Sequence, residues 1–183
     1  GMYTKAAPFD SFQIADIGDV PLNTFNLLKS IDIIEKFVDD VIDHGAKPVS
    51  IGGDHTMTLA LLRSVAKHHG PVALIHIDAH ADTNDVMFGE KVAHGTVFRR
   101  AIEEGLVDCQ KMFQIGLRTT GYAAEDFDWA KDRGITVIQA EECWYKSLSP
   151  LMDEIRATIG PETPVYLSFD IDGLDPSVAP GTG

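Results

Sequence analysis

Three side chains that can bind a metal ion stand at alternate positions in the middle of the chain. Asp78, His80 and Asp82 directly follow a largely apolar run, residues 73–77, that is typical of a buried strand. Because side chains alternate between the two faces of a strand, a strand continued through these positions would place all three on one face. Open α/β folds bind their ligands at the carboxyl ends of strands, so this cluster is a candidate site.

Two other stretches carry similar side chains after predicted strands. One ends in His55, after a predicted strand over 48–51, and the other contains Asp170 and Asp172, after a predicted strand over 165–169. If these strand ends converge, the carboxylates would raise one another's pKa, and burial would add to the cost of charging them. Divalent cations remove this conflict. The candidate ligands are His55, Asp78, His80, Asp82, Asp170 and Asp172.

This ligand set combines oxygen and imidazole and contains no thiolate. It therefore disfavours structural zinc and favours Mn²⁺, with Fe²⁺, Co²⁺ or Ni²⁺ as competitors. Six ligands suit two ions that share bridging carboxylates, and such a pair acidifies the water between them. The expected chemistry is hydrolysis at an electrophilic carbon or phosphorus centre.

Alternating helix and strand signals surround these motifs. Helices are predicted at about 24–44, 56–69, 96–104, 123–133 and 149–159, and strands at 14–20, 48–51, 72–77, 112–116, 135–138 and 165–169. This alternation predicts an α/β fold with a mainly parallel sheet and right-handed crossovers.

Composition limits the class of protein further. The chain has 183 residues, enough for one domain with a buried core, and its net charge of −13 argues against nucleic acid and anionic membranes as partners. No apolar run approaches the roughly 18 residues of a membrane span, and the N-terminus lacks a signal-peptide pattern. Cys109 and Cys143 form no CxxC pair, so we expect reduced thiols in a cytoplasmic protein.

Taken together, the three motifs resemble those of the ureohydrolases, the family of arginase and agmatinase. The match keeps the same order from Gly52 to Gly183. The resemblance implies a three-layer, arginase-like α/β fold with two Mn²⁺ per subunit. One ion would be held by His55, Asp78, Asp82 and Asp170, and the other by Asp78, His80, Asp170 and Asp172, with Asp78 and Asp170 bridging.

The resemblance also implies a mechanism. Hydroxide held between the ions attacks the guanidinium carbon, and the tetrahedral intermediate collapses to urea and an amine. Asp82 would orient the hydroxide and pass a proton to the leaving amine, and His94 matches the family's proton-shuttle histidine. Without the resemblance, His94 is only a histidine that precedes a predicted helix.

The choice of substrate depends on finer similarities. Residues 92–101 resemble the agmatinase-type branch, whereas residues 83–91 and 140–144 most resemble guanidinobutyrase. The resemblance therefore favours 4-guanidinobutyrate, with agmatinase, guanidinopropionase and proclavaminate amidinohydrolase activities as alternatives. By the same analogy, Asn84 and Met87 would contact the substrate chain, although Met87 could instead pack on its own loop.

Other polar residues near the motifs are expected to bind the substrate carboxylate or to support the ligands. A substrate carboxylate needs a cation or donors nearby, and the candidates are Lys91, Arg99 and Arg118. His76, on the buried strand, is expected to be a core residue or to support a ligand. Asp54 and Ser168 are expected to orient ligands.

The chain also departs from the family pattern. Members extend further at both ends, so residues 1–183 are expected to be a fragment of a single ureohydrolase domain that lacks its N- and C-terminal parts. The family's guanidinium-binding glutamate follows the last motif and has no counterpart here. We therefore expect metal binding with little or no turnover. The resemblance implies a homo-oligomer, a trimer or hexamer, with a small guanidino compound as its substrate.

Two alternatives belong to other classes. Gly-Asp-His clusters also serve binuclear metallophosphoesterases, but the Asn-His-Glu element and further metal histidines of that class are not found in this sequence. The other alternative is a non-catalytic, truncated homologue that binds a partner.

Overall fold

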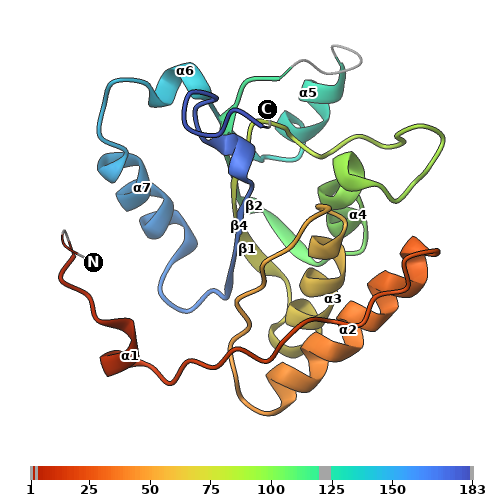
Figure 1. Ribbon diagram of the computed structural model, residues 1–183. Helices are drawn as coiled ribbons and strands as arrows, with labels where there is room; N and C mark the ends of the chain where they lie inside the picture. Colours follow the sequence, from red (N-terminus) through yellow and green to blue (C-terminus); the bar gives the residue numbers. More distant parts are fainter. Residues whose placement is uncertain (1, 3, 120–124, 182–183) are drawn as a thin grey trace.

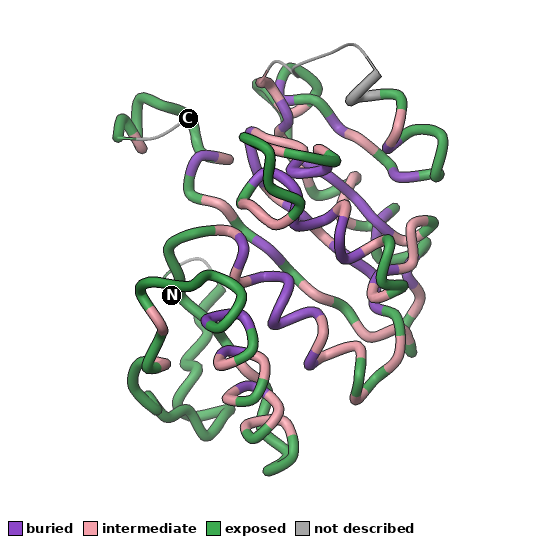
Figure 2. Tube along the Cα trace, turned by 90° about the vertical axis from the view of Figure 1, so that its right-hand side faces the viewer, coloured by how far each residue is buried: buried purple, intermediate pink, exposed green. Residues whose placement is uncertain are grey.

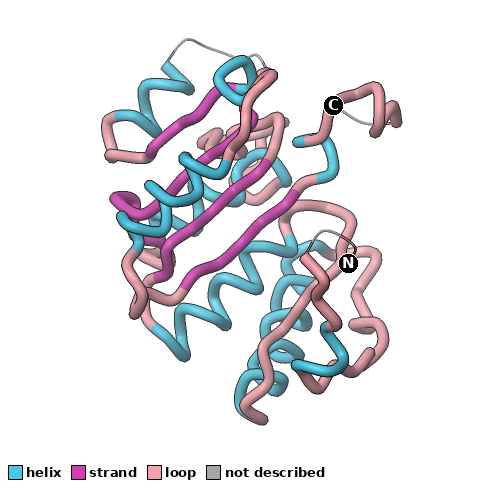
Figure 3. Tube along the Cα trace, turned by 90° about the vertical axis from the view of Figure 1, so that its left-hand side faces the viewer, coloured by secondary structure: helices cyan, strands magenta, loops and turns pink. Residues whose placement is uncertain are grey.

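A parallel sheet forms the centre of the molecule in a computed structural model that describes residues 2, 4–119 and 125–181 (Figure 1). Its strands are β1 (Val72–Ile77), β2 (Val107–Leu117), β3 (Thr136–Gln139) and β4 (Val165–Phe169). They lie in the order β3-β2-β1-β4, and each neighbouring pair is parallel (Figure 3). The prediction of a mainly parallel α/β sheet is confirmed.

The helices largely follow the predicted ones. They are α1 (Pro8–Ser11), α2 (Leu27–Asp43), α3 (Met57–His69), α4 (Val97–Glu103), α5 (Glu125–Lys131), α6 (Ala140–Cys143) and α7 (Ser149–Ile159), with single 3₁₀ turns η1 (His94–Thr96) and η2 (Ile171–Gly173). Asn26 caps α2 by accepting a hydrogen bond from the Lys29 amide at 3.0 Å. Gly70 ends α3 with a φ of +78°, which favours glycine. No helix in the described residues is long and apolar enough to cross a bilayer.

Helices cover both faces of the sheet. Helices α3, α4 and α5 pack on one face and α6 and α7 on the other, while α2 packs on the outside of α3 (Figure 1). The side chains of β1 alternate accordingly, so that Leu74 belongs to the α3–α4 core and Ala73 to the α7 core. Buried residues run through the sheet and the inner helix faces, whereas the N-terminal segment is exposed (Figure 2).

Two predicted strands are wrong. Residues 14–20 and 48–51 form no strand, and Val49 and Ile51 are 93% and 96% exposed. A strand needs a neighbour to complete its hydrogen bonds, and β-branched residues favour strands only where they can pack. Within the described part of the chain neither segment has such a neighbour. The outer edge of β4 is likewise unpaired there, and Leu167 is 61% exposed.

Leu62 tests the core between α3 and the sheet. Its side chain is fully buried, so Leu62→Ala should lower the free energy of unfolding by about 2–5 kcal/mol through lost burial and a cavity. Leu28→Ala is the matched control, because Leu28 is 60% exposed and should change stability by about 0.5 kcal/mol or less. Chemical denaturation measures both variants. Equal losses would contradict this assignment of the core.

Candidate metal centre

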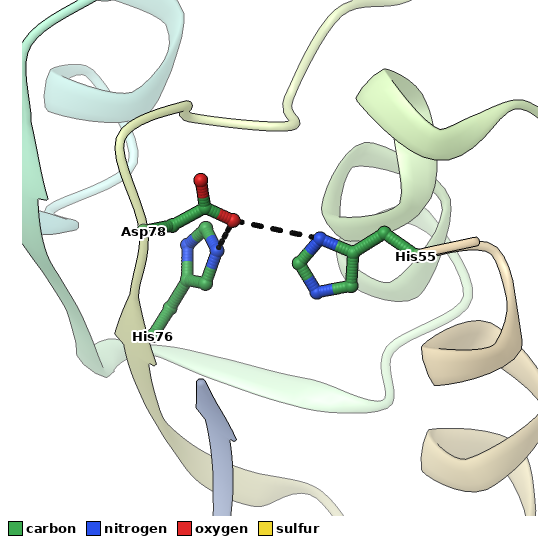
Figure 4. A group of neighbouring side chains, drawn as sticks. All are labelled: His55, His76 and Asp78. Atoms are coloured by element: carbon green, nitrogen blue, oxygen red, sulfur yellow. Dashed lines mark hydrogen bonds and ion pairs between the residues drawn. The ribbon is translucent and has the colours of Figure 1, made fainter. Parts of the chain in front are cut away.

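The six predicted ligands gather where β1 and β4 end. These strands are parallel neighbours, so Asp78 after β1 and Asp170 after β4 emerge at the same edge of the sheet. The Asp170 amide continues the pairing by donating to the Ile77 carbonyl at 2.8 Å. His55, in the turn before α3, faces this edge from the helix side (Figure 4).

One group forms around His55. Its Nδ1 atom lies 2.8 Å from Oδ2 of Asp82, 3.5 Å from Oδ2 of Asp78 and 3.7 Å from Oδ2 of Asp170. Its Nε2 atom lies 3.0 Å from Oγ of Ser168, which fixes the ring. The expectation that Ser168 orients a ligand side chain therefore agrees with this geometry.

A second group forms around His80. Its Nδ1 atom lies 3.0 Å from Oδ2 of Asp172 and 3.4 Å from Oδ1 of Asp78. Oδ1 of Asp172 accepts a hydrogen bond from the Ala79 amide at 3.0 Å. Asp78 thus presents one oxygen to each group, which is the arrangement that a bridging carboxylate requires.

Asp82 reaches its place through an unusual backbone conformation. Its φ is +50°, in the left-handed region that non-glycine residues rarely occupy. The Asp82 carbonyl accepts a hydrogen bond from the Phe98 amide at 3.1 Å, so α4 helps to hold this turn. Backbone strain of this kind is concentrated at functional sites.

In the described residues, no lysine or arginine pairs with the four carboxylates of the site to offset their negative charge. These carboxylates are Asp78, Asp82, Asp170 and Asp172. Burial, and then the charge of Asp82, raise the pKa of Asp78 to about 6. Burial acts to lower the pKa of His55, but the hydrogen bond to Asp82 and the nearby carboxylates raise it overall.

A divalent cation fits this donor set. Ligand atoms of His55, His76 and Asp78 lie within 4.8 Å of one another, and so do those of Asp78, His80 and Asp172. A positive ion would relieve the repulsion among the carboxylates, and oxygen with imidazole suits Mn²⁺ and similar ions.

His94 lies apart from the six candidate ligands. It begins η1, and its Nδ1 atom lies 3.9 Å from Oδ2 of Asp54. Among the described residues, none of the six candidate ligands forms a hydrogen bond or ion pair with it. In the described part of the chain no hydrogen bond or ion pair joins Asp54 to a candidate ligand, contrary to expectation, and its other oxygen accepts the Thr56 amide at 2.9 Å. Asp54 instead shapes the turn before α3.

The two predicted substrate contacts pack against the turn that carries His94. The side-chain amide and the backbone amide of Asn84 both donate to the Gly95 carbonyl, at 3.1 and 3.0 Å. A Cβ atom on Gly95 would lie 2.8 Å from Cε of Met87, so the two residues are in close contact. Both side chains therefore have structural partners, and their contact with substrate stays a prediction.

Of the candidate cations, Arg118 lies nearest the site. Its guanidinium donates to the carbonyls of Asp172 and Leu174 and so holds η2 in place. The other two, Lys91 and Arg99, pair with acidic residues of their own loop or helix.

The sequence predicted no role for Gln114. This buried residue of β2 donates through Nε2 to Nδ1 of His76 at 3.1 Å and to the Ala81 carbonyl at 2.7 Å. Burial and the nearby His55 lower the pKa of His76 to about 3, so its ring is neutral near neutral pH. The only signal for Gln114 in the sequence is a polar side chain among apolar strand neighbours.

Comparison with known proteins fits this site and fold. The family model described as "Arginase family" matches residues 1–183. The chain belongs to the arginase family. It is 62% identical over 182 residues to a guanidinobutyrase of Pseudomonas aeruginosa, covering 100% of this chain and 57% of that protein. It is 52% identical over 180 residues to a mitochondrial agmatinase of Gallus gallus, covering 98% and 53%.

Solved structures agree with the family assignment. A proclavaminate amidinohydrolase from Streptomyces clavuligerus superposes with a TM-score of 0.90 at 39% identity, covering 100% of this chain and 60% of that one. The resemblance to ureohydrolases and the arginase-like α/β fold are therefore confirmed, with a partial sheet of four strands. The chain spans little more than half of the curated relatives described above. The metallophosphoesterase alternative receives no support from these matches.

Metal binding should stabilise the fold. With Mn²⁺ at about 100 times its dissociation constant, the free energy of unfolding should rise by about 2.7 kcal/mol, and a chelator should reverse the gain. His80→Ala should reduce this gain, whereas His69→Ala, at the exposed end of α3, should not. Thermal unfolding with and without Mn²⁺ measures the effect. A chain that Mn²⁺ does not stabilise would contradict the assignment of a metal centre.

Proposed function

We propose that this protein hydrolyses the guanidino group of a small guanidino acid, with 4-guanidinobutyrate favoured, to urea and an amine. The observation that carries the proposal is the meeting of four uncompensated carboxylates with two imidazoles in an arginase-family chain. The 62% identity to a guanidinobutyrase supports the choice of substrate. Agmatinase, guanidinopropionase and proclavaminate amidinohydrolase activities are the alternatives within the family.

Two Mn²⁺ ions are the proposed cofactors. His55, Asp78, Asp82 and Asp170 would hold one ion, and Asp78, His80, Asp170 and Asp172 would hold the other; the contacts of His55 and His80 with these carboxylates support the assignment. When bound, such ions lower the pKa of water so that hydroxide is available near neutral pH.

Asp82 and His94 are proposed to handle protons. Asp82 sits beside His55 with its backbone fixed by α4, so its carboxylate can accept a proton and pass it to the leaving amine. The side chain of His94 is 54% exposed and can exchange protons with solvent. Oδ2 of Asp54 lies 3.9 Å from the Nδ1 atom of His94.

The loop beside His94 is proposed to bind the part of the substrate that lies beyond its guanidino group. Asn84 and Met87 touch Gly95, which follows His94, so a substrate that reaches the metal centre would pass close to both. Asn84 offers an amide and Met87 an adaptable apolar surface. These groups suit a short aliphatic chain with a polar end.

Assembly and location are also proposals. A single ureohydrolase domain that works in the cytoplasm as a homo-oligomer, a trimer or hexamer, fits the family. The edge of β4 is unpaired in the described residues, and the apolar side chains of Leu167 and Phe169 beside it are exposed, so further protein could cover this surface.

Urea release tests the proposed activity. The imidazoles of His80 and His94 are 46% and 54% exposed, so water reaches this side of the site, and we expect little turnover by the 183-residue chain itself. A chimaera in which this chain replaces the matching 182 residues of the Pseudomonas aeruginosa guanidinobutyrase supplies the remaining surroundings. With Mn²⁺, this chimaera should release urea from 4-guanidinobutyrate faster than from 3-guanidinopropionate, agmatine or arginine.

Two variants of the chimaera test the role of Asp82, one at Asp82 itself and one as a matched control. Asp82→Asn removes the proposed proton carrier and should lower kcat by about 10²–10⁴-fold, whereas Asp175→Asn, at an exposed carboxylate after η2, should not. A chimaera that binds Mn²⁺ yet releases urea from none of the four compounds would refute the proposed activity. Preference for agmatine would favour the agmatinase alternative.

Counting bound metal tests the bridging role of Asp170. If Asp170 contacts both ions, Asp170→Asn should abolish binding of both, because each site loses a charged ligand. Asp172→Asn should remove mainly one ion, and Asp175→Asn should remove neither. Elemental analysis of Mn²⁺ per chain after dialysis measures the result. Two ions retained by Asp170→Asn would show that Asp170 does not bridge.

A further inference from the structure

His76 touches the proposed bridging carboxylate from inside the core. It lies on β1 with 0% of its surface exposed, and its Nε2 atom lies 2.7 Å from Oδ2 of Asp78 (Figure 4). The family resemblance gives His76 no role in binding metal. Two roles are therefore open: His76 binds an ion itself, or it holds Asp78 in place.

The Ala81 carbonyl determines which way the side-chain amide of Gln114 points. The Ala81 carbonyl can only accept a hydrogen bond, so the atom of Gln114 that lies 2.7 Å from it must be the nitrogen. The same nitrogen has a second hydrogen, which points to Nδ1 of His76 at 3.1 Å. Nδ1 of His76 is therefore an acceptor.

This orientation fixes the tautomer of His76. A neutral imidazole carries one hydrogen, and because Nδ1 accepts, the hydrogen is on Nε2. Nε2–H then donates to Oδ2 of Asp78. Phe98 packs on the ring with 4.3 Å between centroids, so the ring has little freedom to turn.

Both oxygens of Asp78 are consequently oriented by fixed donors. Oδ2 accepts from His76, and Oδ1 accepts from the His80 amide at 2.6 Å. A carboxylate held in this way already points one oxygen to the His55 group and the other to the His80 group. Metal binding then does not have to order the Asp78 side chain. Residues that orient ligands in this manner raise metal affinity by about 10–100-fold.

We propose that Gln114 and His76 form a buried positioning pair that holds Asp78 ready to bridge two metal ions, with His76 locked as its Nε2–H tautomer. The metal part of this inference rests on the proposed function, whereas the tautomer does not. His76 is thus a positioning residue, because it acts through Asp78. A direct ligand would need a free lone pair where Nε2–H stands.

The tautomer can be observed directly in the 183-residue chain without metal. Long-range ¹H–¹⁵N correlation spectra distinguish a protonated ring nitrogen from an unprotonated one. His76 should show a protonated Nε2 and an unprotonated Nδ1. Gln114→Glu places only acceptors beside Nδ1, and should change this pattern. A wild-type His76 protonated on Nδ1 would overturn the proposal, whether or not the chain binds Mn²⁺ or releases urea.

Metal affinity tests the positioning role. His76→Leu removes the donor to Asp78 and should weaken Mn²⁺ binding by about 10–100-fold. His76→Gln can place an amide N–H where Nε2–H stands, and should restore binding to within about threefold of wild type. Leu62→Ala is the control for general destabilisation, because it opens the same core without touching Asp78, and should leave the affinity unchanged. Titration calorimetry with Mn²⁺ measures all of these chains.

Each outcome separates the two roles of His76. Unchanged affinity in His76→Leu would show that His76 is only a core residue. Equal loss in His76→Gln and His76→Leu would show that the imidazole is a ligand, and would also overturn the proposal. If His76→Leu does not fold, Gln114→Met tests the same hydrogen-bond chain, with an expected loss of affinity and loss of the single tautomer. Weak Mn²⁺ binding by the wild-type chain counts against the metal centre, while the spectra still decide the tautomer.

Discussion

Repulsion among four carboxylates is the constraint on which the arrangement of this molecule depends. Parallel pairing of β1 with β4 brings Asp78 and Asp170 to the same edge of the sheet. The turn before α3 contributes His55 and the loop after β1 contributes Asp82, with 2.8 Å between Nδ1 of His55 and Oδ2 of Asp82. In the described part of the chain no lysine or arginine pairs with these acids, so the fold holds a concentration of negative charge that a cation must offset.

The position of this site could be predicted from the sequence, although the backbone conformation that places the three residues differs from the predicted strand. Alternation along a strand predicted that Asp78, His80 and Asp82 would share a face. In the structure β1 ends at Ile77, and the three residues lie in the following loop. They separate into two groups because Asp82, with a φ of +50°, turns to His55 while His80 turns to Asp172. The spacing of the motif was informative, but only the loop conformation divides it.

Features that depend on distant parts of the chain could not be predicted. Residues 48–51 have strand-like types, yet whether they form a strand depends on a neighbour that no local pattern specifies. Gln114 matters only because β2 pairs with β1, which sets it opposite His76. Asp54 and Ser168 were assigned the same role from sequence, and only Ser168 reaches a ligand, because it lies on β4 beside the site. Pairing of strands therefore decides which polar residues support the centre.

Two other elements approach the backbone of Asp78 closely. A Cβ atom on Gly116 of β2 would lie 3.2 Å from the Asp78 carbonyl, and Gly116 has a φ of +97° that favours glycine. A Cβ atom on Gly173 of η2 would lie 3.2 Å from the Asp78 amide. Two glycines thus let β2 and η2 approach Asp78 from different elements, while His76 holds its side chain from below. By contrast, His94 and its loop meet solvent. The carboxylate cluster around Asp78 is therefore set in rigid packing, whereas the loop that carries His94 is exposed, and exposed loops vary more between related proteins than packed elements do.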